Sequence, residues 1–103
     1  MTPVETLKAV RAIIAEAEDM KGAYFFRPIS GAGARRAFER KHTHPVVEWT
    51  EGGHEYSAEF CVACSCRNVY ARGYYYRDGQ KTTITTIRNS AARLARNLGE
   101  VSA

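Results

Sequence analysis

The stretch PVVEWTEGGHEYSAEFCVACSCRNVYARGYYYRDGQKTTITT, residues 45–86, decides the fold. Polar and apolar residues alternate through most of it, which is typical of half-buried β-strands. Three two-residue turns interrupt the alternation, at Gly52-Gly53, Arg67-Asn68 and Asp78-Gly79. Gly-Gly and Asp-Gly favour the tight turns of β-hairpins, because both positions tolerate positive φ. The stretch therefore predicts a four-stranded antiparallel β-meander over residues 45–86.

These turns also predict which residues are paired across the sheet. The first turn places Trp49 opposite Tyr56, and the second places Phe60 opposite Tyr75. Directly paired residues share a face, so most apolar side chains project to one side of the sheet. A slip of one residue in any hairpin would destroy this agreement.

Helices are expected on both sides of the meander in the sequence. Residues 3–21 begin with a capping box, in which Thr2 is the N-cap and Glu5 follows three residues later, and apolar residues then recur at helical spacing. Residues 87–98 carry a second apolar stripe, with Thr86 as the expected N-cap. Each stripe needs a cover, as does the apolar sheet face. We therefore predict an α+β fold, a single domain over residues 1–103, with both helices packed on one sheet face and an irregular basic segment at 22–44.

Length and composition limit the function classes. The chain has 103 residues, a mass of 11.5 kDa and a net charge of +4, which allows a polyanionic partner. No apolar run approaches the ~20 residues of a membrane helix, so we expect no membrane association. Three cysteines crowded into residues 61–66 do not indicate a disulfide framework, and we expect a cytoplasmic protein. Eleven Arg against four Lys are typical of GC-rich coding and suggest a phage origin.

The polar face of the predicted sheet is the first candidate site. It carries three tyrosines and two cations, namely Tyr70, Arg72, Tyr74, Tyr76 and Lys81. The predicted register places Tyr74 beside Cys61, Tyr76 beside Glu59 and Lys81, and Arg72 beside Ala63. Flat rings flanked by cations are how many proteins stack unpaired bases. Tyrosine and arginine also dominate protein interfaces, including those between copies of one chain, and tyrosines also stabilise strands with no partner at all.

Two further groups of cations extend this candidate site. The connecting segment at 27–44 contains five Lys and Arg against one Glu, and its candidate contacts are Arg35, Arg36, Arg40 and Lys41. The polar flank of the C-terminal helix adds Arg93 and Arg96. Guanidinium groups suit phosphate contacts, although an ordinary solvated helix face has the same composition.

Metal binding and catalysis have weaker support. Cys64 and Cys66 with His42 and His44 have the residue types of a zinc site, but alternation directs both thiols into the apolar face, where cysteine packs as a small hydrophobe. His54 lies at a turn, and nothing in the sequence fixes a second catalytic group near it. We expect no cofactor, no metal and no enzymatic activity.

The predicted order of helix, three strands and a final alanine-rich helix resembles the double-stranded-RNA-binding domain. That family opens its second helix with a lysine cluster, whereas the corresponding stretch here, Lys81 to Thr86, has one lysine and reads as an additional strand. The resemblance covers topology only. The sequence therefore predicts a small nucleic-acid-binding accessory protein, for RNA or single-stranded DNA, and the alternative is a protein-binding module that uses the same tyrosines.

Overall fold

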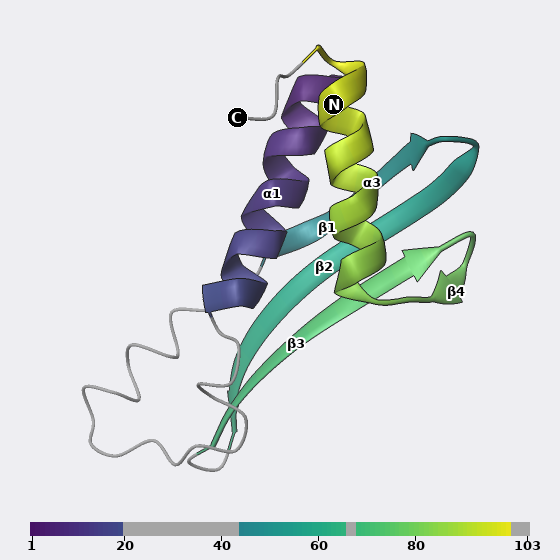
Figure 1. The fold of residues 1–103 in the computed structure, drawn as a ribbon. Coiled ribbons are helices and arrows are strands. Elements are labelled where there is room, and N and C mark those ends of the chain that lie inside the picture. Colours follow the sequence, from purple (N-terminus) through teal and green to yellow (C-terminus); the bar gives the residue numbers. More distant parts are fainter. Residues whose placement is uncertain (20–43, 66–67, 100–103) are drawn as a thin grey trace.

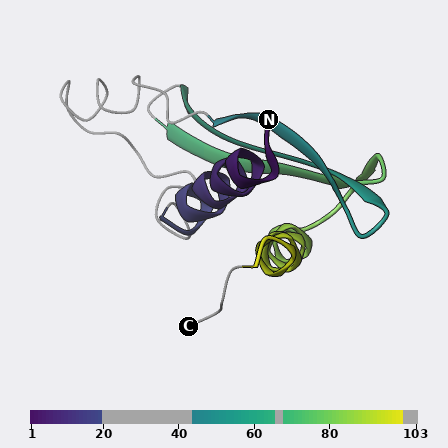
Figure 2. The same cartoon turned by 90° about the horizontal axis from the view of Figure 1, so that it is seen from above.

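The computed structural model describes residues 1–19, 44–65 and 68–99. Its elements are α1 (Pro3–Asp19), β1 (His44–Glu51), β2 (His54–Ser65), β3 (Asn68–Arg77), β4 (Gln80–Lys81) and α3 (Ile84–Asn97) (Figure 1). The strands form one antiparallel sheet in the order β1-β2-β3-β4. Both helices lie on the same side of this sheet (Figure 2), which confirms the predicted fold class.

Helix α1 starts where the capping box predicts. The Thr2 backbone amide donates to Glu5 Oε1, and the Glu5 amide donates to Thr2 Oγ1, both at 3.1 Å. Leu7, Val10 and Ile13 recur at helical spacing and are buried against the sheet. The helix is described as far as Asp19, so the predicted end at residue 21 lies outside the described residues.

Two of the predicted hairpin turns are confirmed. Gly52 and Gly53 have φ of 60° and 80°, and Asp78 and Gly79 have φ of 51° and 78°. Positive φ at both central residues defines the tight turn whose twist matches the flanking strands. The first turn pairs Trp49 with Tyr56, as predicted.

The pairing between β2 and β3 differs from the prediction by two residues. Phe60 lies opposite Gly73 instead of Tyr75, and Asn68 already belongs to β3, opposite Ser65. The observed register places the smallest residue opposite Phe60, and the Tyr75 ring lies over Gly73, where a side-chain methyl would overlap it. Because side chains alternate with a period of two, this shift leaves every residue on its predicted face.

The fourth strand is shorter than predicted. Strand β4 contains only Gln80 and Lys81, and Ile84 to Thr86 belong to α3 instead of the meander. The N-cap is Thr83, whose hydroxyl accepts from the Thr86 amide, so Thr86 is not the cap. The run of β-branched residues favours a strand locally, but a helix that starts at Ile84 buries Ile87 completely, and this packing outweighs local propensity.

The core lies between the two helices and the sheet. Trp49 is at its centre: its ring stacks on Tyr56 with centroids 5.4 Å apart, and its Nε1 donates to Ser90 Oγ of α3 at 2.9 Å. Ser90 is completely buried, so this hydrogen bond satisfies two polar groups that water does not reach. The buried apolar residues are Leu7, Val10, Ile13, Val47, Trp49, Tyr56, Ala58, Phe60, Ile87, Ala91 and Ala95.

Candidate functional site

The sheet face turned away from α1 and α3, called the open face below, carries the candidate site (Figure 2). Alternation assigns residues to it, because their strand neighbours are buried beneath the helices on the other face. One row across all four strands consists of Glu48, Ser57, Tyr76 and Lys81. The next rows pair Glu59 with Tyr74 and Cys61 with Arg72.

The two-residue shift changes the neighbours that the sequence predicted. Tyr74 lies beside Glu59 instead of Cys61, and Arg72 lies beside Cys61 instead of Ala63. Tyr76 keeps its predicted neighbour Lys81 but lies beside Ser57 instead of Glu59. The consequence is chemical, because a carboxylate now borders Tyr74.

Arg72 and Tyr74 form the centre of the site. They are two residues apart on β3 and project to the same face, and the guanidinium carbon of Arg72 lies 5.9 Å from the centroid of the Tyr74 ring. This distance is within the range of a cation–π contact. Tyr74 retains 37% of its accessible surface, so part of its ring remains free for a ligand.

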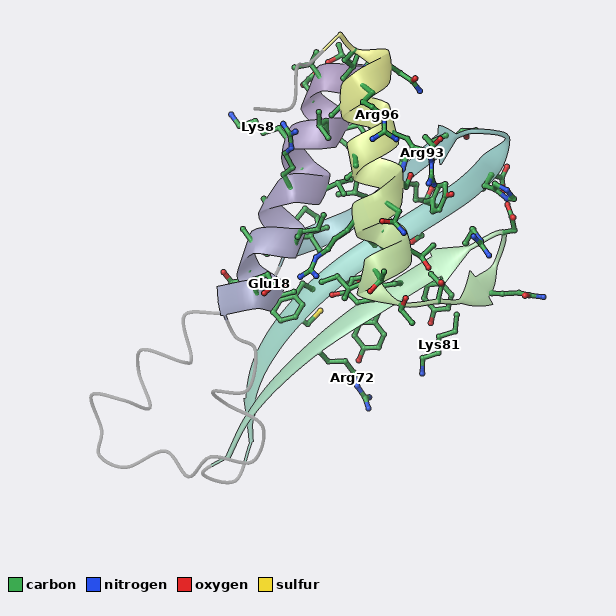
Figure 3. The ribbon with its side chains drawn as sticks, in the orientation of Figure 1. Lys8, Glu18, Arg72, Lys81, Arg93 and Arg96 are labelled. Carbon is green, nitrogen blue, oxygen red and sulfur yellow. The ribbon has the colours of Figure 1, made fainter. Side chains whose placement is uncertain are left out.

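Lys81 is the second cation of the open face. It is exposed on β4, and no ion pair of Lys81 occurs among the described residues. Figure 3 shows Arg72 and Lys81 on the β3–β4 side of the molecule, whereas Lys8 lies on α1. We call the surface formed by Arg72, Tyr74, Tyr76 and Lys81 the β3–β4 strip.

The charged side chains on the rest of the described open face are acidic. Glu48 projects from β1, and Glu55 and Glu59 project from β2. A hollow of about 500 Å³ at the turn end of this face is lined by Glu48 and Glu55 together with Tyr76, and by no lysine or arginine. The open face is therefore divided, with carboxylates on β1 and β2 and cations on β3 and β4.

The Glu59 carboxylate has a hydrogen-bond partner in Cys61, two residues further along β2. Cys61 Sγ donates to Glu59 Oε1 at 2.8 Å. Burial and the adjacent carboxylate raise the pKa of the Cys61 thiol to about 11, so the thiol stays protonated near neutral pH. Cys61 therefore acts as a hydrogen-bond donor to Glu59 instead of a reactive thiolate.

Arg93 connects α3 to the β1–β2 hairpin. Its Nε donates to Glu51 Oε1 at 2.9 Å, and its Nη2 donates to the Tyr56 hydroxyl at 3.2 Å (Figure 3). Glu51 is buried, and the hydrogen bond from Arg93 to its carboxylate raises the pKa of Arg93. From the sequence, Arg93 was predicted to lie on a binding surface. The sequence does contain a signal for the contact with Glu51, because a glutamate on the core face of a strand requires a cationic partner.

The remaining arginines of α3 differ in their surroundings. Arg88 forms an ion pair with Glu18 and so joins α3 to α1. Arg96 is exposed near the end of α3, and no ion pair of Arg96 occurs in the part of the chain that the structure describes (Figure 3). Helix α3 and the β3–β4 strip lie on opposite sides of the sheet. The structure therefore does not bring Arg96 close to the strip.

His54 has a structural partner. Its Nδ1 lies 2.6 Å from Asp78 Oδ2, and Asp78 Oδ1 accepts from the Glu55 amide at 2.9 Å. The Asp78 side chain thus joins the two hairpin turns. These hydrogen bonds lower the pKa of Asp78, that from the Glu55 amide most strongly.

Several predicted site residues lie outside the described part of the chain. They are Arg35, Arg36, Arg40, Lys41 and the side chain of Tyr70, together with His42 and the side chains of Cys64 and Cys66 that formed the zinc alternative. Within residues 1–19, 44–65 and 68–99, no three His, Cys, Asp or Glu side chains are grouped as a metal site requires. The described residues contain eight Lys and Arg against nine Asp and Glu, so the positive excess of the chain comes from the remainder.

Comparisons with known proteins add no relative. The chain matches no protein-family model, no curated protein and no solved structure. The resemblance to the double-stranded-RNA-binding domain therefore stays a prediction from the sequence. None of the described helices has the length and apolar character needed to cross a membrane.

Proposed function

We propose that this chain is a small non-enzymatic accessory protein that binds nucleic acid through the β3–β4 strip. The observation that carries the proposal is the Arg72–Tyr74 contact on a sheet face that neither helix covers, with Lys81 and Tyr76 in the neighbouring row. Exposed aromatic rings stack on bases, and arginine and lysine contact phosphates. A phage origin would accord with the arginine-rich composition, and a cytoplasmic location with three cysteines that do not indicate a disulfide framework.

The spacing of the two tyrosines supports a stacking role. Tyr74 and Tyr76 are alternate residues of one strand, so their Cα atoms are about 7 Å apart along β3. Two rings at this spacing can each take one base of a flexible single strand. Lys81 beside Tyr76 and Arg72 beside Tyr74 then supply a cation near each base.

The connecting segment supplies the long-range attraction in this proposal. Residues 27–44 carry five Lys and Arg against one Glu, whereas the described residues are close to neutral. A basic segment raises the local concentration of a polyanion and speeds its association, and this contribution weakens with salt. The strip would then position the bases.

The test is a fluorescence-anisotropy titration of labelled single-stranded RNA and DNA at two salt concentrations. Tyr74→Ala should weaken binding about ten-fold, because stacking on one aromatic contributes ~1–3 kcal/mol per base, while Tyr74→Phe should retain most of the affinity. Lys81→Ala should reduce the slope of log affinity against log salt by about 1, and Lys8→Ala on α1 is its matched control.

Two results of this titration would contradict the proposal. Absence of binding to either oligonucleotide at about 50 mM salt would contradict it, because phosphate contacts are strongest at low salt. Equal losses for Lys81→Ala and Lys8→Ala would show non-specific attraction without a role for the strip.

The mixed charge of the open face favours a second candidate function, a protein-binding module. Glu48, Glu55 and Glu59 on one half and Arg72 and Lys81 on the other give a surface of both charge signs, which a protein with the opposite arrangement would complement. A second copy of the chain is one such partner. Sedimentation of the purified protein over a range of concentrations tests self-association directly.

A further inference from the structure

The border between the two halves of the open face lies directly beside the stacking position. Glu59 is the cross-strand neighbour of Tyr74, and Glu48 lies one strand further from the β3–β4 strip. Paired strands are about 4.8 Å apart, so the carboxylate half and the cationic half lie side by side within a face about 15 Å wide. The Cys61 hydrogen bond fixes one oxygen of Glu59 at this border.

The division of charge on the open face affects a single nucleic-acid strand and a duplex differently. A single strand that stacks on Tyr74 and Tyr76 has one row of phosphates, which can lie along Arg72 and Lys81. A duplex presents a second row across a groove of about 6 or 12 Å. With one row along the strip, the second row falls above β2 or β1, where Glu59 and Glu48 repel it.

We propose that Glu48 and Glu59 are specificity-determining residues that exclude duplexes from the open face and restrict it to unpaired strands. This inference rests on the proposed nucleic-acid function and adds a role for two acidic residues that do not themselves hold the ligand. Repulsion of an unwanted partner is a common source of specificity, because it lowers the affinity of one ligand more than that of the other.

The distribution of charge on the open face also fits an unpaired strand better than a duplex. If the open face served duplex nucleic acid, carboxylates on β1 and β2 would be expected to be replaced by neutral or basic side chains, since duplex affinity rises with the number of phosphates neutralised. The hollow at the turn end, which Glu48 and Glu55 line, offers no cation to a phosphate. The geometry thus leaves the β3–β4 strip as the only part of the described open face suited to a phosphate row.

The experiment compares one labelled strand, free and annealed to its complement, in RNA and DNA forms at about 50 mM salt. The Glu48→Gln/Glu59→Gln variant removes the charge and keeps hydrogen-bond acceptors, including that for Cys61. A control variant, Glu5→Gln/Glu16→Gln, changes net charge equally on α1, and glutamine at position 5 maintains the capping box. Thermal unfolding of each variant confirms that it is folded.

The wild-type protein should bind the free strand at least about ten-fold more tightly than the duplex. The open-face variant should increase duplex affinity about three- to ten-fold and single-strand affinity by a smaller factor, because the second phosphate row of a duplex lies closer to Glu48 and Glu59 than the row along the strip does. The control should shift both ligands equally. Equal wild-type affinity for both ligands, or an equal gain for both in the open-face variant, would overturn this inference and leave the proposed function standing. Binding to neither ligand would overturn both.

Discussion

Replacing Phe60 and Tyr74 by alanine, one variant at a time, measures how differently the two sheet faces contribute to stability. Phe60 is 4% exposed within the core, and deletion of a buried aromatic side chain typically costs ~3–5 kcal/mol. Tyr74 is 37% exposed, contacts Arg72 and lies opposite Glu59 on β2. An exposed cation–π contact and a cross-strand pair each contribute ~0.5–1 kcal/mol, so Tyr74→Ala should cost about 1–2 kcal/mol.

Urea unfolding, monitored by the fluorescence of Trp49, measures how much each variant loses in free energy of unfolding. Trp49 is the single tryptophan of the chain and is buried at the centre of the core, so its emission reports on core exposure. With a slope of about 1–1.5 kcal/mol per M for a domain of this size, Phe60→Ala should lower the midpoint by about 2–5 M and Tyr74→Ala by about 0.7–2 M. Phe60→Leu is the milder variant if Phe60→Ala does not fold. Similar losses at Phe60 and Tyr74 would refute the assignment of the two faces, and with it the site.

Three further measurements test individual contacts. Ser90→Ala should destabilise the fold by about 1–2 kcal/mol, because it leaves the buried Trp49 N–H without an acceptor while improving helix propensity slightly; an unchanged urea midpoint would contradict this. Asp78 has a lowered pKa in the folded state through hydrogen bonds from a backbone amide and His54, so its contribution is present above its unfolded pKa near 3.8 and is lost as pH falls through the lower folded pKa. Asp78→Asn should therefore flatten the loss of stability between about pH 5 and pH 2, and a curve parallel to that of the wild type would count against the contact. Cys61 should react slowly with a thiol reagent at pH 7 and faster as pH approaches its pKa of about 11; rapid labelling at pH 7 would show that the thiol is not held as described.

Most of the fold was accessible from short-range sequence signals. The capping box at Thr2 and the turns at Gly52-Gly53 and Asp78-Gly79 are local, and each depends on residues that tolerate few other conformations. The boundary between β4 and α3 was not accessible in this way. Local propensity favours a strand up to Thr86, and only the burial of Ile87 against the rest of the core decides for the helix.

The candidate site was predicted at the level of faces but not of contacts. In the sequence, Arg93 is one more cation on the polar flank of a helix. Its hydrogen bond to Glu51 depends on how α3 crosses the β1–β2 hairpin. That crossing is a tertiary property, which a helical pattern alone does not specify. The buried glutamate was the only local indication that one of the arginines must be engaged.

The two-residue error in the predicted β2–β3 register separates the site features that alternation predicts from those that only the structure shows. A shift of two residues leaves Tyr74 and Arg72 on the open face, so a surface with these two residues follows from alternation alone. The same shift replaces Cys61 by Glu59 as the neighbour of Tyr74, and so changes a nearly neutral surrounding into an anionic one. The proposed affinity for nucleic acid therefore rests on features that alternation alone predicts. The proposed discrimination between one strand and two rests on the carboxylate directly beside the Tyr74 ring, and that neighbour is known only from the register.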